Sequence, residues 1–202
     1  MEKPILPPPP LPRISFSGKI HVITSDAELQ KLSQNLLNCH ELGFDTETRP
    51  SFKKGEVYQT AMLQLATEDD AYLIRLHGIK EFSLLKKILE DQNILKAGVA
   101  IRDDLKQLQK VFPFTPKNFT ELQDLAKVKG LKNFGLKGMT EEILEATISK
   151  GPKLTNWENP VLADHQLLYA ATDAWIGLKL YHKLQTIPVS TDARLTGAKI
   201  DD

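Results

Sequence analysis

The sequence predicts a mixed α/β fold, in which a central β-sheet is flanked by α-helices. Three strand-like stretches follow one another over residues 41–76, and their connections are short enough for antiparallel pairing. An almost continuous apolar run over residues 94–101 has the composition of a strand buried on both faces, as in parallel sheets. Most of the remaining chain carries apolar residues at helical spacing. The 202 residues are enough for one well-packed domain and few for two.

The N-terminal part of the chain is expected to form a tail, a hairpin and a helix. Residues 1–13 are rich in proline, which favours an extended, flexible tail in front of the domain. Residues 14–23 alternate apolar and polar side chains around a serine–glycine pair, a pattern typical of a β-hairpin. Ser25 and Glu28 match a capping box, and leucines at helical spacing then predict a helix over residues 26–38.

The later part of the chain mixes strands and helices. Apolar periodicity and turn residues predict strands over residues 41–47, 57–66, 71–76 and 94–101, and helices over residues 82–89, 105–111, 120–128, 139–148 and 160–185. The last of these helices ends before a proline, and residues 188–202 form a polar tail. We therefore expect a single domain that spans residues 14–187.

Composition narrows the class of protein. The chain has 26 basic and 26 acidic residues, so no overall field attracts nucleic acid and any site for it must be local. No apolar run approaches the ~20 residues that span a membrane, and the N-terminus lacks the apolar core of a signal peptide. The single cysteine, Cys39, excludes an intramolecular disulfide and fits a reducing, cytoplasmic location.

Two carboxylates end the strand over residues 41–47. Asp45 and Glu47 are two residues apart, so they project to the same face about 7 Å apart along the strand. Like charges held on one face repel each other unless a positive charge lies between them, and a hard divalent cation is the usual partner. The alternative is a strand end in solvent, where acidic residues are common.

Further acidic residues follow on other elements. Asp103 and Asp104 close the apolar run over residues 94–101, where an acid often serves as a helix N-cap. Tyr169 and Asp173 are four residues apart in the last helix and share a face, on which Asp173 is either partnered or solvated at the edge. Carboxylates gathered from separate elements would form a site for two divalent metal ions, which suits phosphoryl displacement.

These stretches resemble the motifs of the DEDD superfamily of 3′–5′ exonucleases, in its tyrosine subclass. The first motif is FDTE at residues 44–47, the second is KAGVAIRDDL at residues 96–105, and the third is LYAATDA at residues 168–174. The third motif in its setting is the most specific, and the resemblance spans residues 14–187. The pattern is most similar to the Werner-syndrome-type exonuclease domain and next to ribonuclease D.

The resemblance implies a ribonuclease-H-like fold and two divalent ions, Mg²⁺ or Mn²⁺, held by four carboxylates: Asp45, Glu47, Asp104 and Asp173. Asp45 would bridge the two ions, and Asp104 would reach the second one largely through water. Glu47 would also lie near the terminal 3′-hydroxyl. Tyr169 would orient the attacking water, but a free tyrosine has a pKa near ~10, so we do not expect it to be the main base.

Three positions fix the assignment of the motifs. The histidine subclass has a histidine five residues before the last aspartate, where this sequence has Leu168, so the tyrosine subclass fits. The distance from Gly98 favours Asp104 over Asp103, which would then be a cap or face solvent. His165 lies one turn before the tyrosine and is expected at the surface or behind the site.

Nucleic-acid contacts are expected from lysines beside the acidic site. The candidates are Lys53, Lys54, Lys132, Lys137 and Lys153, for each of which a solvated position on the surface is the alternative. Phe134 and Trp157 could stack on bases, but core packing is the expectation favoured for both.

The sequence thus predicts a metal-dependent 3′–5′ exonuclease that releases nucleoside 5′-monophosphates from nucleic acid, with DNA favoured. One alternative is ribonuclease D-like processing of RNA 3′ ends, because the motifs do not distinguish the two sugars. The other is a catalytically silent nucleic-acid-binding domain of the same fold. The expected partner is the 3′ end of a DNA or RNA strand. No membrane partner is expected. A role in DNA repair is a further expectation.

Overall fold

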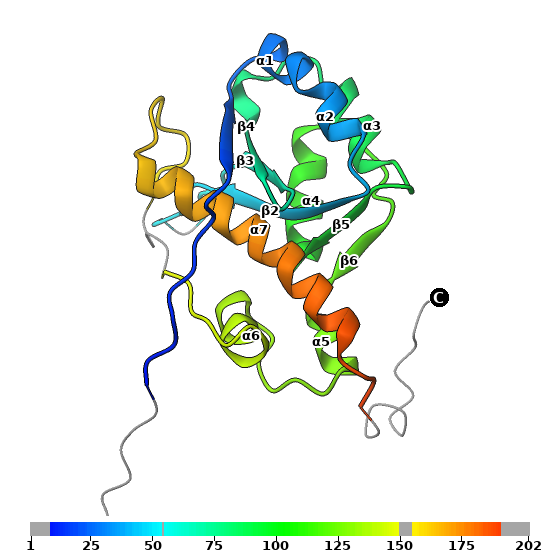
Figure 1. Ribbon diagram of the computed structural model, residues 1–202. Helices are drawn as coiled ribbons and strands as arrows, with labels where there is room; N and C mark the ends of the chain where they lie inside the picture. Colours follow the sequence, from blue (N-terminus) through cyan, green and yellow to red (C-terminus); the bar gives the residue numbers. More distant parts are fainter. Residues whose placement is uncertain (1–8, 54, 150–154, 191–202) are drawn as a thin grey trace, which may run out of the picture.

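The computed structural model describes residues 9–53, 55–149 and 155–190 (Figure 1). Most of the two predicted tails, and the candidate lysines Lys54 and Lys153, lie outside these residues. The division into a domain and two tails therefore stays a prediction. Within the described residues, no helix has the length and apolar character needed to cross a membrane.

A six-stranded mixed sheet forms the centre of the fold. Its strands are β1 (Lys19–Ile23), β2 (Glu41–Thr48), β3 (Thr60–Ala66), β4 (Asp70–Arg75), β5 (Leu95–Gly98) and β6 (Phe119–Glu121), in the spatial order β1-β4-β3-β2-β5-β6. The β2-β3 and β3-β4 pairs are antiparallel, whereas β1-β4, β2-β5 and β5-β6 are parallel. This confirms the predicted mixed α/β class, the antiparallel succession of early strands and the parallel buried strand.

Helices cover both faces of the sheet (Figure 1). They are α1 (Asp26–Lys31), α2 (Ser33–Leu37), α3 (Ser83–Leu89), α4 (Ile101–Val111), α5 (Leu122–Val128), α6 (Leu136–Ile143) and α7 (Asp164–Thr186), with a short 3₁₀ turn at Leu76–Gly78. Helices α1 to α4 share one core with the sheet, and α5 to α7 share the other. Helix α7 lies directly on β2, β3, β4 and β5.

The predicted N-terminal hairpin is wrong. Residues 19–23 form one strand, β1, which pairs in parallel with the distant strand β4. A Cβ atom on Gly18 would lie 2.2 Å from the carbonyl oxygen of Asp69, so this glycine serves a close backbone approach and not a turn. Alternation along the strand reports a half-buried strand correctly, but it does not identify the partner strand.

Several predicted boundaries also shift. The helix expected over residues 26–38 is divided at Leu32 into α1 and α2. Helix α6 begins and ends earlier than the expected 139–148. Helix α7 begins at Asp164, because the backbone N–H of Ala163 donates to the Gln166 side chain at 2.7 Å and fixes the start there. The short strand β6 was not expected, because three residues are too few to show the apolar–polar alternation of a strand.

A glycine sets how closely α7 approaches β2. A Cβ atom on Gly43 would lie 1.9 Å from the carbonyl oxygen of Ala174. The helix backbone therefore rests against the strand backbone. This contact brings Asp173, the neighbour of Ala174, over the end of β2 where Asp45 lies.

We expect Gly43→Ala to reduce the free energy of unfolding by about 3 kcal/mol, because the added methyl group pushes α7 off β2. Urea denaturation measures this change. Gly135→Ala is the control, because no described atom beyond the adjoining residues lies within 4 Å of its Cβ position; as an N-cap change its effect should stay within ~1 kcal/mol. A Gly43→Ala protein as stable as the parent would contradict the close packing.

Candidate metal centre

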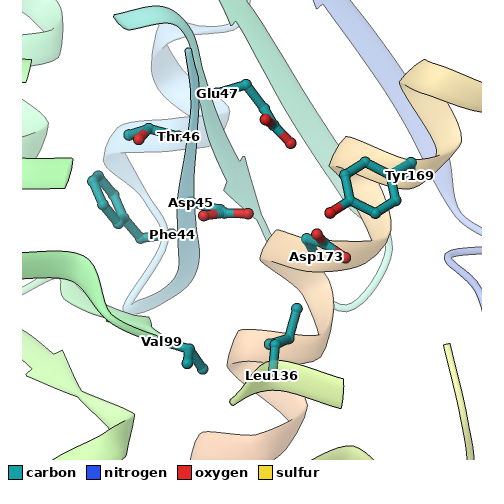
Figure 2. A pocket seen from close by; sticks show the side chains of 8 residues that line it. All are labelled: Phe44, Asp45, Thr46, Glu47, Val99, Leu136, Tyr169 and Asp173. Carbon is teal, nitrogen blue, oxygen red and sulfur yellow. The ribbon is translucent and has the colours of Figure 1, made fainter. Parts of the chain in front are cut away.

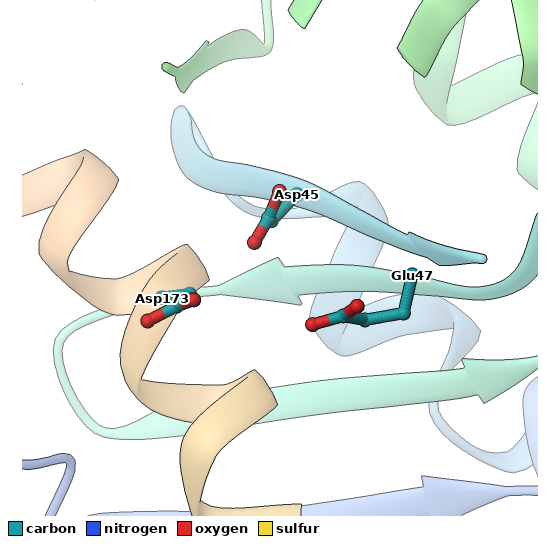
Figure 3. A group of neighbouring side chains, drawn as sticks. All are labelled: Asp45, Glu47 and Asp173. Carbon is teal, nitrogen blue, oxygen red and sulfur yellow. The ribbon is translucent and has the colours of Figure 1, made fainter. Parts of the chain in front are cut away.

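Three carboxylates from two elements converge in the structure. Asp45 and Glu47 come from β2 and Asp173 from α7, and one oxygen of each lies within 4.8 Å of the others (Figure 3). They line a cavity of about 280 Å³ together with Phe44, Thr46, Val99, Leu136 and Tyr169 (Figure 2). The first and third sequence motifs thus meet in space at their carboxylates, and the second contributes Val99 to the cavity wall.

Strand alternation explains how β2 presents its side chains. Phe44 and Thr46 point to one side of the strand, and Asp45 and Glu47 point to the other, toward α7 (Figure 2). Phe44 is 1% exposed and anchors the strand in the core shared with α4. The strand end is therefore held rigidly by apolar packing on one side while its acidic residues line the cavity on the other.

Asp104 approaches the site from the other side of β2. It lies in the first turn of α4, and the hydroxyl of Thr46 donates a hydrogen bond to its carboxylate at 2.7 Å. It is not one of the three carboxylates whose oxygens lie within 4.8 Å. Asp103 is exposed and pairs with Lys106 at 3.0 Å, whereas the partly buried Asp104 is the one whose charge acts on Asp45 and Glu47.

Burial and mutual repulsion make the carboxylates hard to ionise. Burial, followed by the charges of Asp173 and Glu47, raises the pKa of Asp45 well above its usual value. Burial, then the charges of Asp173 and Asp104, raises the pKa of Glu47 to about 8. Burial also raises the pKa of Asp173 to about 6, although a hydrogen bond from Tyr169 lowers it. All three therefore favour a nearby positive charge.

The donor set fits a hard divalent cation. All the converging ligand atoms are carboxylate oxygens, which Mg²⁺ and Mn²⁺ prefer. The Oδ1 atom of Asp173 is buried and has no hydrogen-bond partner among the described residues. An unpaired buried carboxylate oxygen is costly, and coordination of a cation would offset this cost.

Tyr169 lies one helical turn before Asp173 and shares a hydrogen bond with it. Burial, followed by the negative charge of Asp173, raises the pKa of the Tyr169 phenol above its usual value. The phenol therefore stays protonated at neutral pH and acts as a hydrogen-bond donor. A protonated phenol is not a base at neutral pH, and its role in orienting the attacking water stays a prediction.

The sequence did not identify the walls of the cavity. Val99 and Leu136 line it, and neither residue was singled out from the sequence. Trp157 is 4% exposed in the core, and its ring lies nearly parallel to that of Tyr169, with 6.3 Å between centroids. A tryptophan in a loop carries no sequence signal for this role, because the contact joins residues on different elements.

The remaining candidates do not line the cavity. Lys53 and Lys132 are exposed, and Lys137 pairs with Glu141 at 3.5 Å. None of these three described lysines lines the cavity. His165 is exposed near the start of α7, as expected. The partly buried Phe134 packs against the core beneath the ammonium of a neighbouring lysine.

Comparisons with known proteins agree with this site. A family model described as 3′–5′ exonuclease matches residues 20–187. The chain is 35% identical over 184 residues to the mouse bifunctional 3′–5′ exonuclease/ATP-dependent helicase WRN, covering 86% of this chain and 13% of that protein. It is 31% identical over 196 residues to a 3′–5′ exonuclease of Arabidopsis thaliana, covering 88% of this chain and 67% of that protein.

A solved structure shows the same fold. The crystal structure of Escherichia coli RNase D, described as an exoribonuclease involved in structured RNA processing, matches with a TM-score of 0.75 and 29% sequence identity. The match covers 88% of this chain and 46% of that chain. The chain thus spans less than half the length of the mouse WRN protein and of RNase D.

We expect the metal-free protein to lose stability as the pH rises from 5 to 8. The folded-state pKa of Glu47 is about 8 against an ordinary 4.5, so folding favours the protonated form. This stabilising contribution is complete below pH 4.5 and is lost as the pH rises through about 8. Thermal unfolding in EDTA measures the effect.

Glu47→Gln should remove part of this pH dependence and raise the Tm at pH 8 by about 2 °C or more, which corresponds to ~1 kcal/mol in a domain of this size. Glu81 is exposed, so Glu81→Gln is the control, and its Tm should equal that of the parent protein at every pH. Identical pH profiles for the parent and Glu47→Gln would show that the carboxylates do not repel each other as described.

Proposed function

The chain belongs to the 3′–5′ exonuclease family, and we propose that it hydrolyses the terminal phosphodiester at the 3′ end of a nucleic acid. The products would be a nucleoside 5′-monophosphate and a chain shorter by one nucleotide. The observation that carries this proposal is the convergence of Asp45, Glu47 and Asp173 beside Tyr169 in one cavity. A cavity of about 280 Å³ suits one terminal nucleotide better than a duplex.

The proposed cofactor is a pair of divalent ions, Mg²⁺ or Mn²⁺. Asp45, Glu47 and Asp173 would hold one ion, and Asp45 with Asp104 would hold the other. When bound, such ions lower the pKa of a coordinated water and neutralise charge on the phosphate. Cluster geometry and the all-oxygen donor set support the proposal, since three repelling carboxylates need positive charge between them.

The chain's own residues position the reacting groups. The protonated phenol of Tyr169 would donate a hydrogen bond toward the attacking water or the scissile phosphate. Asp104, tied to β2 through Thr46, would keep its charge directed at the second ion. In the reaction, the water oxygen bonds to phosphorus as the bond from phosphorus to the 3′-oxygen of the preceding nucleotide breaks, and that oxygen gains a proton.

DNA is the first candidate substrate. The 35% identity to the mouse exonuclease–helicase is higher than the 32% identity to E. coli ribonuclease D.

RNA is the second candidate substrate, and the likeness to RNase D favours it. That structure is described as an exoribonuclease and aligns with 88% of this chain. A silent nucleic-acid-binding domain is the least supported alternative, because four acids held at one site would destabilise such a domain with no use for them.

Contacts to the nucleic-acid backbone are proposed for Lys53 and Lys132, which are exposed, and for Lys137 with its partner Glu141. Phe52 is 71% exposed in the loop after β2, beside Lys53, and an exposed aromatic ring there suits stacking on an unpaired base. Cytoplasmic location and a role in DNA repair stay predictions from the sequence.

We expect Asp45→Asn to lower the exonuclease rate by about 1000-fold or more, because it removes a charge shared by both proposed ions. The assay is shortening of a 5′-labelled single-stranded oligonucleotide with Mn²⁺ or Mg²⁺, with an EDTA control and chromatography of the released nucleotides. Asp104→Asn should also be impaired, whereas the exposed Asp103→Asn should keep the parent rate. Equal loss in both neighbouring variants would contradict the assignment of Asp104.

A second assay compares DNA and RNA of matched sequence under the same conditions. The proposal predicts faster removal of the terminal nucleotide from DNA, the substrate that the higher identity to the mouse exonuclease–helicase favours. Faster removal from RNA would replace the first candidate substrate with the second and leave the proposed chemistry unchanged.

A further inference from the structure

Arg75 is the largest fully buried side chain of the described residues, with 2% of its surface exposed. It is the last residue of β4. None of the ion pairs among the described residues includes it; its Nη2 atom donates instead to the carbonyl oxygens of Trp157 at 3.1 Å and Asn159 at 2.5 Å. Burial of a guanidinium costs free energy when its partners are carbonyl groups and not carboxylates. We therefore ask what the fixed position of the segment bonded to Arg75 contributes.

Sheet register places Arg75 on the face that carries the acidic residues. Glu47 of β2 pairs with Met62 of β3, and Met62 pairs with Arg75 of β4. Directly paired residues project to the same face of a sheet. Arg75 therefore lies on the face covered by α7, two strands away from Glu47.

The segment that Arg75 holds contacts the site through one ring. The ring of Trp157 lies at 26° to that of Tyr169, and the Tyr169 phenol is hydrogen-bonded to Asp173. A continuous series of contacts thus runs from β4 through the loop before α7 to a proposed metal ligand. It joins parts of the chain that are far apart in sequence.

A second arginine ties the same loop more weakly. Arg49, two residues after Glu47, pairs with Glu158 at 3.3 Å, and the side chains are 39% and 40% exposed. Exposed ion pairs of this kind contribute little to stability. The buried bonds from Arg75 to the flanking carbonyl groups are the stronger restraint on residues 157–159.

We propose that Arg75 is a positioning residue for Tyr169. By fixing the backbone of residues 157–159, it holds the Trp157 ring against the tyrosine and keeps the phenol directed at Asp173. The inference rests on the proposed exonuclease function, because it assigns Arg75 to the positioning of a group in that reaction. Loss of this restraint displaces the phenol and slows the chemical step more than it weakens substrate binding.

The test is a double-mutant cycle between Arg75→Met and Tyr169→Phe. Single-turnover assays with a 5′-labelled oligonucleotide give the rate constant for removal of the terminal nucleotide, and its substrate dependence gives the half-saturating concentration. We expect Arg75→Met and Tyr169→Phe each to lower the rate constant about ten-fold or more, with less than about two-fold change in that concentration. In the Tyr169→Phe background, Arg75→Met should add less than about a two-fold loss.

Lys96→Met is the matched control. Lys96 is also fully buried, and its ammonium group donates to three backbone carbonyl oxygens, those of Ile88, Asp91 and Ile94. It contacts neither Tyr169 nor Trp157 in the described structure. Its substitution should lower the Tm, and any loss of rate should multiply with that of Tyr169→Phe, as for an independent site.

Trp157→Phe tests the same series of contacts, because Trp157 lies between Arg75 and Tyr169. If Arg75→Met does not fold, this variant tests the proposed positioning of Tyr169 in its place. It should show the same lack of additivity with Tyr169→Phe. Parent-like rates in Arg75→Met, no effect of Tyr169→Phe, or multiplying losses in the cycle would each overturn the inference. Full activity in Asp45→Asn would instead overturn the proposed function, so the two failures are distinguishable.

Discussion

Mutual repulsion among buried carboxylates is the constraint on which this structure depends. Asp45, Glu47 and Asp173 bring oxygens within 4.8 Å of one another, and Asp104 adds its charge from the other side of β2. In water such groups would separate, but here they are fixed on a strand and a helix that pack against each other. Burial raises the pKa values of all three, the neighbouring charges raise those of Asp45 and Glu47 further, and a divalent cation would offset both effects.

The fold supplies the rigidity that this arrangement requires. Apolar side chains on one face of β2 lock the strand into the core, while Gly43 lets the backbone of α7 rest against it. One helix turn then places both Tyr169 and Asp173 over the strand end. Arg75 and Trp157 brace the tyrosine from the other direction, through the loop that leads into α7. Each acidic residue is thus held by packing from its own element.

The sequence predicted which acidic residues converge better than it predicted the details of the fold. Strand alternation placed Asp45 and Glu47 on one face, and helical spacing placed Tyr169 beside Asp173, because both relations are local. The hairpin at residues 14–23 failed, since Gly18 serves contact with Asp69 and pairing with β4 depends on distant residues. Arg75 was missed for the same reason, because its partners lie more than 80 residues away. Long-range contacts of this kind leave no local pattern.

Calorimetric titration of Mn²⁺ into the protein tests the central claim most directly, because it measures the cation site without depending on the choice of nucleic acid. We predict that the parent protein binds two ions and that Asp45→Asn loses this binding while its thermal unfolding shows an intact fold. Binding that is absent from the parent, or unchanged in Asp45→Asn, would contradict the account of the carboxylate cluster as a metal centre.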